Sequence, residues 1–317
     1  MGTAIVAAPN VAKPQLLTAP AEPPWTEQML GVDEFFRVPV GPVEASLAVY
    51  VIEPEGEDQI SPRGTIIVLH GMGARSAWMH GTATNLARHG YRAVLVDLRG
   101  HGASSGKLLT YGLQESRDIS QVIDALAERR LLSGRLGVYG ISYGAATAIH
   151  LAAVDRRVEA VVAVAPFSDM RGEVAHYLRT IGLPGVGLLL TDEQIQAAVD
   201  EAGELGRFSP DMADAGLAIR YTGAPVLLLH GTADMIIPLE HSERLHEAAP
   251  QHSDFQPLRG YGHLTVWLDP LHTVRRRSVA WFDRYLTDES PVVEPPAMEQ
   301  RRLNDAELSF GRAPGGR

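Results

Sequence analysis

Short apolar runs along the chain alternate with segments that have a helical pattern. Five of the runs are continuously apolar, at residues 65–69, 93–96, 136–139, 158–164 and 226–229. Runs of this kind are typical of strands buried on both faces of a parallel sheet. Helix-like segments lie between them, at residues 83–89, 115–129 and 145–153. This alternation predicts the α/β fold class, with a doubly wound, mostly parallel sheet.

Other patterns border this alternation at its two ends. Residues 35–40 and 45–52 form two extended segments with Gly-Pro between them, which is the signal of a hairpin. A last strand is expected at residues 255–258, followed by a closing amphipathic helix at residues 274–286. We therefore expect a hairpin before the parallel strands and a helix after them.

The length of 317 residues and the hydrophobic content of 45% fit one large α/β domain with an insertion. The core is expected at residues 35–167 and 219–287. Residues 168–218 interrupt the alternation with Gly-Pro turns and an acidic helical stretch, which predicts a small, mainly helical lid over the carboxyl ends of the strands. Residues 1–34, rich in Ala and Pro, predict a flexible arm and are a candidate remnant of a trimmed export signal. Residues 288–317, rich in Pro, Gly and charge, predict a disordered tail.

Composition excludes several classes of partner and chemistry. The formal net charge is -10 and the acidic residues are scattered, which disfavours nucleic acid and anionic membranes as partners. No apolar run approaches the roughly 20 residues of a transmembrane helix. The absence of cysteine excludes disulfides, thiolate metal sites and a cysteine nucleophile. The compartment and the oligomeric state stay open, because exported proteins can also lack cysteine.

The motif Gly-x-Ser-x-Gly occurs twice, around Ser142 (residues 140–144) and around Ser104 (residues 102–106). Ser142 directly follows a predicted buried strand and precedes a run of small helix-forming residues, which is the strand-turn-helix context of a nucleophile elbow. Ser104 lies several residues beyond its strand. Its Ser-x-x-Lys pattern with Lys107 lacks the Lys-Thr-Gly partner motif of penicillin-binding-type esterases. We predict Ser142 as the nucleophile and Ser104 as a turn residue.

Four stretches in this order resemble the α/β-hydrolase superfamily, in its esterase, lipase and serine-peptidase-like branch. They are His-Gly-Met-Gly at 70–73, Asp-Leu-Arg-Gly-His-Gly at 97–102, the elbow at 140–144, and Gly-Thr-Ala-Asp at 231–234 with Gly-His at 262–263. The resemblance covers roughly residues 35–287. It implies an α/β-hydrolase fold and a triad in the order serine, acid, histidine.

A serine hydroxyl needs a histidine to take its proton and a carboxylate to orient that histidine. The resemblance implies Asp234 as the acid, because it stands in the Gly-Thr-x-Asp context after a strand. It implies His263 as the base, because this residue lies in the loop after the last strand. Asp169, after the preceding strand, is the alternative acid, since some members of the superfamily carry the acid at that place.

The oxyanion of the reaction needs backbone donors. Tyr143, directly after the nucleophile, is expected to supply one amide. The resemblance implies that Met72 supplies the other, with Gly73 as the alternative if the loop is offset by one residue.

The other histidines are assigned no catalytic role. His70 and His230 each end a strand and are expected to pack turns, while His101 is expected to be a loop residue. His241 and His246 are five residues apart, which does not place them together on a helix as metal ligands. No dinucleotide fingerprint follows the first buried strand, so we expect no cofactor and no metal.

These residues predict acyl transfer by a carboxylesterase acting on a small-molecule ester. Tyr177 and Leu178 of the lid, and Trp267 beyond the histidine, are candidates to line an apolar acyl pocket. A serine peptidase or amidase is the alternative within the same fold, because the same triad can cleave amides. A non-catalytic hydrolase-like binding protein is the alternative of another class, which the complete set of residue types disfavours.

Overall fold

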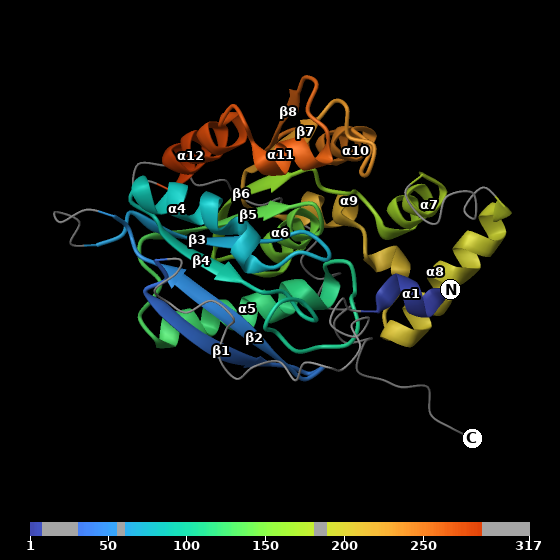
Figure 1. Ribbon diagram of the computed structural model, residues 1–317, viewed down its shortest axis with the longest axis horizontal. Helices are drawn as coiled ribbons and strands as arrows, with labels where there is room; N and C mark the ends of the chain where they lie inside the picture. Colours follow the sequence, from blue (N-terminus) through green and yellow to red (C-terminus); the bar gives the residue numbers. More distant parts are fainter. Residues whose placement is uncertain (8–30, 56–60, 181–188, 287–317) are drawn as a thin grey trace.

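The computed structural model describes residues 1–7, 31–55, 61–180 and 189–286. Eight strands form one sheet in the order β1-β2-β4-β3-β5-β6-β7-β8 (Figure 1). They are β1 (Glu34–Val40), β2 (Ala45–Ile52), β3 (Gly64–Leu69), β4 (Arg92–Val96), β5 (Arg135–Ile141), β6 (Val158–Val164), β7 (Val226–Gly231) and β8 (Ser253–Leu258). β1 and β2 pair antiparallel, as does β2 with β4, and all other pairs are parallel. The predicted fold class is confirmed.

Helices cover both faces of the sheet, which explains why β3, β4 and β7 are buried at every position. The helices are α4 (His80–Arg88), α5 (Leu113–Glu128), α6 (Tyr143–Val154), α10 (Glu240–Ala248), α11 (His263–Leu268) and α12 (Thr273–Tyr285), with the short η1 (Ser76–Met79) before α4. Side chains of β3 alternate between the two faces: Ile66 and Val68 join the core under α4, α11 and α12, whereas Ile67 and Leu69 join the core under α5, α6 and α10 (Figure 1).

The segment between β6 and β7 is helical in the residues that the structure describes. It contains α7 (Met170–Thr180), α8 (Asp192–Gly206), η3 (Pro210–Met212), α9 (Ala215–Ala218) and η4 (Ile219–Tyr221). Thr191 begins α8 with a capping box, in which its side chain and that of Gln194 each bind the other residue's backbone amide. The predicted insertion thus corresponds to α7, α8, η3 and α9, and its action as a lid stays a proposal.

The amino-terminal residues 1–7 differ from the expected flexible arm. Residues Gly2–Val6 form α1, which packs against α8 with Ile5 and Val6 buried (Figure 1). The Gly2 amide donates to Glu201 of α8 at 2.9 Å, and the Tyr111 hydroxyl donates to the Ile5 carbonyl oxygen at 3.0 Å. Ile5 and Val6 are buried near α8, which lies nearly 200 residues further along the chain. Local sequence therefore does not reveal their burial.

The remaining parts of the predicted arm and tail, residues 8–30 and 288–317, lie outside the described residues. Within the described part of the chain, no helix combines the length and the apolar character needed to cross a membrane.

Candidate active site

The carboxyl ends of four parallel strands carry the predicted site residues. Met72 follows β3, Ser142 follows β5, Asp234 follows β7, and His263 begins α11 after β8. The carboxyl ends of parallel strands lie at the same edge of a sheet, where ligands of open α/β sheets bind. The topology therefore gathers residues that are nearly 200 positions apart in the chain.

Ser142 lies in a strained turn between β5 and α6. Its φ of 56° and ψ of −119° fall outside the regions that side chains ordinarily allow. A Cβ atom at Gly140 would overlap the carbonyl oxygen of Gly144, and one at Gly144 would lie 2.6 Å from the carbonyl oxygen of His70. Both glycines of the motif are thus required by close backbone approach, and the turn they permit displays the serine at the end of its strand.

Asp234 and His263 form a hydrogen-bonded pair beyond β7 and β8. The His263 Nδ1 lies 2.7 Å from Asp234 Oδ2. The other carboxylate oxygen, Oδ1, accepts the backbone amides of Ile236 and Ile237, both at 2.9 Å. The Asp234 side chain is fully buried, whereas that of His263 is 15% exposed. A carboxylate held in this way fixes the ring with Nδ1 protonated and leaves Nε2 able to take a proton.

Asp169, the alternative acid, is engaged in shaping the start of the insertion. Its Oδ1 accepts the Gly172 amide at 2.6 Å, and its Oδ2 accepts the Ser168 hydroxyl at 2.8 Å. These bonds satisfy both carboxylate oxygens and cap the first turn of α7. The structure thus brings His263 together with Asp234 and uses Asp169 in the insertion.

The loop after β3 adjoins the elbow. A Cβ atom at Gly71 would lie 3.3 Å from the Cβ of Ser142, so this loop passes directly beside the serine at Gly71. Tyr143 is the first residue of α6, and the first amides of a helix have no intrahelical acceptor. Its buried hydroxyl accepts the Tyr111 amide at 3.1 Å, and burial raises the pKa of Tyr143 well above its ordinary value. This side chain anchors the backbone that follows the serine.

The three side chains predicted to line an acyl pocket lie in different surroundings, and their role as a pocket stays a prediction. Leu178 packs against the core under α5 and α6, while Tyr177 is 46% exposed. Trp267 stacks against Trp78, with ring centroids 5.5 Å apart. Trp78 escaped the sequence analysis, although its place shortly after the loop that carries Met72 was a usable signal.

Two histidines that end strands take the packing roles expected of them. His70 donates from Nδ1 to the Gly71 carbonyl oxygen at 2.8 Å and accepts the Leu98 amide on Nε2 at 3.0 Å. Burial lowers the pKa of His70 to about 4, so this ring is neutral at pH 7. His230 lies 2.8 Å from the Ile237 carbonyl oxygen and thereby supports the loop that presents Asp234.

Glu173 of α7 is a buried carboxyl group that the sequence analysis missed. Its Oε2 lies 3.5 Å from Nε2 of His241. Burial, reinforced by the charges of Asp234 and Asp169, raises the pKa of Glu173 to about 9, which keeps this carboxyl protonated at pH 7. One acidic residue in an acidic insertion carries no local signal of burial, so only the packing of α7 against the core could reveal it.

Comparison with known proteins identifies the family. Residues 45–208 match the model of the X-Pro dipeptidyl-peptidase (S15) family, which is 164 of the 317 residues. The chain belongs to the S15 family. This S15 chain is 30% identical over 162 residues to the uncharacterized protein YqkD of Bacillus subtilis (strain 168), covering 50% of this chain and 51% of that protein. It thus spans about half the length of that relative.

Solved structures of low sequence identity share the fold of the S15 chain. The esterase Pf2001 of Pyrococcus furiosus superposes with a TM-score of 0.63 at 20% identity, over 84% of this chain and 100% of that one. An acylaminoacyl peptidase of Pyrococcus horikoshii superposes with a TM-score of 0.60 at 19% identity, over 81% of this chain and 42% of that one. The architecture is therefore that of the α/β serine hydrolases, a fold that serves ester and peptide chemistry alike.

Proposed function

We propose that this chain is a serine hydrolase that cleaves carboxylic esters through an acyl-enzyme intermediate. Ser142 attacks the ester carbonyl while His263 takes its proton and Asp234 stabilises the imidazolium. The amides of Tyr143 and Met72 bind the tetrahedral oxyanion. His263 then protonates the leaving alcohol, and it activates the water that releases the acid from Ser142.

The bond between His263 Nδ1 and Asp234 Oδ2 is the observation that carries this proposal. A histidine next to a buried carboxylate, itself fixed by two backbone amides, is the arrangement in which an imidazole acts as a base toward serine. The strained φ of Ser142 supports the same role, because such strain persists where the surrounding structure holds it and is concentrated at active sites.

Exposed apolar side chains near these residues favour an ester with an apolar acyl group. Met72 is 45% exposed and Trp78 is 51% exposed, and Leu264 next to the histidine is also exposed. Helix α7 of the insertion contacts the loop that carries Asp234, since His176 Nε2 lies 2.9 Å from the Met235 carbonyl oxygen. We propose on this ground that residues 168–218 act as a lid.

The first test treats the folded protein with a fluorophosphonate and locates the adduct by mass spectrometry. We expect the adduct on Ser142, because only an activated serine is phosphonylated quickly. An adduct on another serine would move the nucleophile to that residue, and the absence of any adduct would favour a non-catalytic hydrolase-like binding protein. Rates on p-nitrophenyl esters of increasing chain length then measure the acyl preference.

Peptide-bond hydrolysis is the second candidate, favoured by the membership in the S15 family. The same triad cleaves an amide if the leaving nitrogen is protonated well. We compare Ala-Pro-p-nitroanilide with p-nitrophenyl butyrate on the same preparation and expect kcat/KM to be higher on the ester. A higher kcat/KM on the dipeptidyl anilide would replace the esterase assignment with a dipeptidyl-peptidase.

A further inference from the structure

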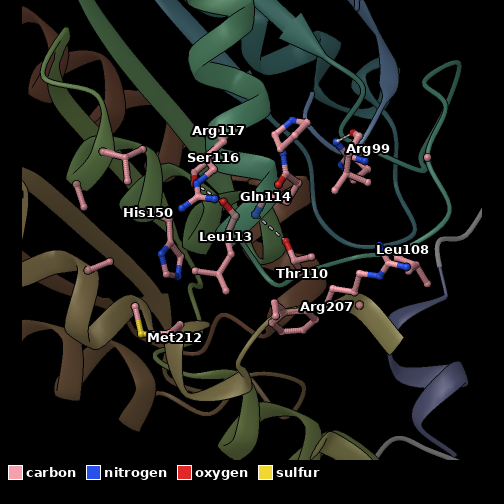
Figure 2. Close-up of a pocket in the computed structure, with 18 of the residues that line it drawn as sticks. Arg99, Leu108, Thr110, Leu113, Gln114, Ser116, Arg117, His150, Arg207 and Met212 are labelled. Carbon is pink, nitrogen blue, oxygen red and sulfur yellow. Dashed lines mark hydrogen bonds between the residues drawn. The ribbon is translucent and has the colours of Figure 1, made fainter. Parts of the chain in front are cut away.

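A cavity lies apart from the candidate active site, between the core helices and the insertion. Its volume is about 730 Å³. Its wall is formed by α5 and α6, by the end of α8 with η3, α9 and η4, and by the turn between β1 and β2 and the loop between β4 and α5. None of Ser142, Asp234 and His263 lines it. Figure 2 shows Leu113, His150 and Met212 around one part of this cavity and Arg207 with Leu108 at another.

The wall of this cavity is apolar over a large part. Leu113 of α5, Val154 of α6, and Phe208 and Leu217 of the insertion contribute aliphatic or aromatic surface. His150 adds a neutral ring at pH 7, because burial lowers its pKa to about 4. A volume of this size and lining of this kind are typical of sites that enclose a small organic ligand.

The charged residues that line the cavity are mostly cationic, whereas the chain as a whole is acidic. The cavity is lined by four cationic residues and two anionic ones, while the whole chain carries a net charge of -10. The cations are Arg99, Lys107, Arg117 and Arg207, and the anions are Glu44 and Asp214. Because Asp118 neutralises Arg99, three cations remain against two anions, and this small positive excess on an acidic protein favours a ligand with an anionic group.

The cations differ in their freedom to bind a ligand. Arg99 is buried and held by Asp118 through two bonds of 2.7 and 2.9 Å. Lys107 and Arg207 are exposed, and within the described part of the chain neither side chain has an ion pair or a side-chain hydrogen bond. Arg207 ends α8 with a φ of 55°, which places it where the insertion turns back toward η3. Lys107 and Arg207 can therefore turn toward a bound anion.

We propose that this cavity binds an amphipathic anion, with its alkyl chain among the apolar residues of α5, α6 and the insertion and its carboxylate between Lys107 and Arg207. Apolar burial supplies the greater part of the affinity, and the two cations select the charged head. Such a ligand would contact both the insertion and α6, the helix that begins directly after Ser142. The inference does not depend on the reaction proposed for Ser142.

The test is isothermal titration calorimetry of the full chain with dodecanoate, kept below its micellar concentration. We expect one saturable site in the wild type. A second titration uses protein whose Ser142 has been blocked with a fluorophosphonate, and we expect the Kd of dodecanoate to be unchanged. Loss of binding after this block would place the ligand in the acyl pocket of the active site and overturn the proposal, as would the absence of saturable binding to the wild type.

Variants separate the two parts of the ligand. The double substitution Lys107→Met and Arg207→Met keeps apolar stems of similar length and should raise the Kd of dodecanoate about tenfold, because both charge-assisted contacts are lost. Uncharged 1-dodecanol should bind the wild type and the double variant with the same Kd. Acetate, which lacks the chain, should show no saturable binding.

Arg276→Met on α12 is the matched control, since Arg276 is exposed and does not line the cavity. We expect it to leave the Kd of dodecanoate within twofold of the wild type. Unchanged affinity in the double variant, or an equal loss in Arg276→Met, would show that the two cations do not bind the head group and would overturn the proposal. Thermal melting of each variant confirms that it is folded.

Discussion

The loop after β4 and the candidate active site contain the same three residue types. The loop has Asp97, His101 and a Gly-x-Ser-x-Gly serine, Ser104, within eight residues. In the candidate active site, the serine, aspartate and histidine follow three different strands, β5, β7 and β8. Each set contains a serine, a histidine and an aspartate, so only the hydrogen bonds and burial of these residues distinguish the two.

Asp97, His101 and Ser104 of the β4 loop each form hydrogen bonds to backbone groups that stabilise the fold. The Ser104 hydroxyl donates to the Asp97 carbonyl oxygen at 2.6 Å and accepts the Ala48 amide at 2.8 Å. The Asp97 carboxylate accepts the amides of Ser76 and Ala103 at 2.6 and 2.8 Å. His101 donates from Nδ1 to the Arg99 carbonyl oxygen at 2.8 Å. Asp97, His101 and Ser104 are thus buried and tied to backbone groups.

The contrast shows that residue types and a motif do not make an active site. His263 has one nitrogen bound to a carboxylate and a ring that is partly exposed, as the proposed proton transfer requires. His101 is fully buried, and burial together with the neighbouring His70 lowers its pKa to about 4. A ring that stays neutral and enclosed at pH 7 supports packing instead of proton transfer.

Replacement of the two serines should give the largest difference. We expect Ser142→Ala to lower kcat/KM on p-nitrophenyl butyrate by about 10^5- to 10^6-fold, since loss of a nucleophile removes the acyl-enzyme route. Ser104→Ala, the matched change in the β4 loop, should retain kcat/KM within about threefold. Loss of fluorophosphonate labelling in Ser104→Ala with retention in Ser142→Ala would reverse the assignment.

The two candidate acids offer the next contrast. Asp234→Asn should lower kcat by about 10^3- to 10^4-fold, because an amide in place of the carboxylate favours the wrong tautomer of His263. Asp169→Asn is the isosteric control and should change kcat by less than about tenfold. Initial rates at saturating ester measure both, and a larger loss in Asp169→Asn would identify Asp169 as the acid.

The structural role of Ser104 predicts an effect on stability. Ser104→Ala removes the partner of the buried Ala48 amide and of the Asp97 carbonyl oxygen, which should lower the free energy of unfolding by about 1–3 kcal/mol. Urea denaturation followed by circular dichroism measures this. Ser105→Ala, on an exposed side chain in the same loop, provides the comparison, and an equal or larger loss there would contradict the special role of Ser104.

Acid should affect the β4 loop through His101. The pKa of this ring is about 4 in the folded protein, below its ordinary value of 6.5, so the unfolded chain binds the extra proton first. The free energy of unfolding should therefore fall as the pH drops from about 6.5 towards 4. His101→Asn should reduce this fall by about 1–2 kcal/mol between pH 7 and 5. The exposed His89→Asn is the control, and an equal reduction in that variant would contradict the role of His101.

The sequence predicted the strands well because their burial is recorded locally. Predicted residues 65–69 became Gly64–Leu69, and residues 158–164 became Val158–Val164. A strand covered on both faces must be apolar at consecutive positions, so the signal needs no knowledge of the partner strands. The sequence analysis did not predict α11, because its six residues are too few to show a helical period.

Local sequence carried less information wherever distant elements meet. From sequence alone, Ile5 and Val6 are part of an arm rich in Ala and Pro, but α8 covers them in the fold. Glu173 likewise has the sequence context of a surface acid, although it is buried near Asp234. No sequence motif indicated the cavity between α6 and the insertion. Each of these features depends on contacts between segments far apart in the chain.

The sequence by itself determined the α/β architecture and the elbow context that distinguishes Ser142 from Ser104. Consecutive apolar residues mark the buried strands, and the glycines on either side of the serine mark the tight turn. The sequence favoured Asp234 over Asp169 as the acid, but both follow strands of the same sheet, and only the tertiary structure decided which of them meets His263. The physical reason is that hydrogen-bond partners and burial, which set the charge and basicity of a side chain, come from residues that adjoin it in space and not in sequence.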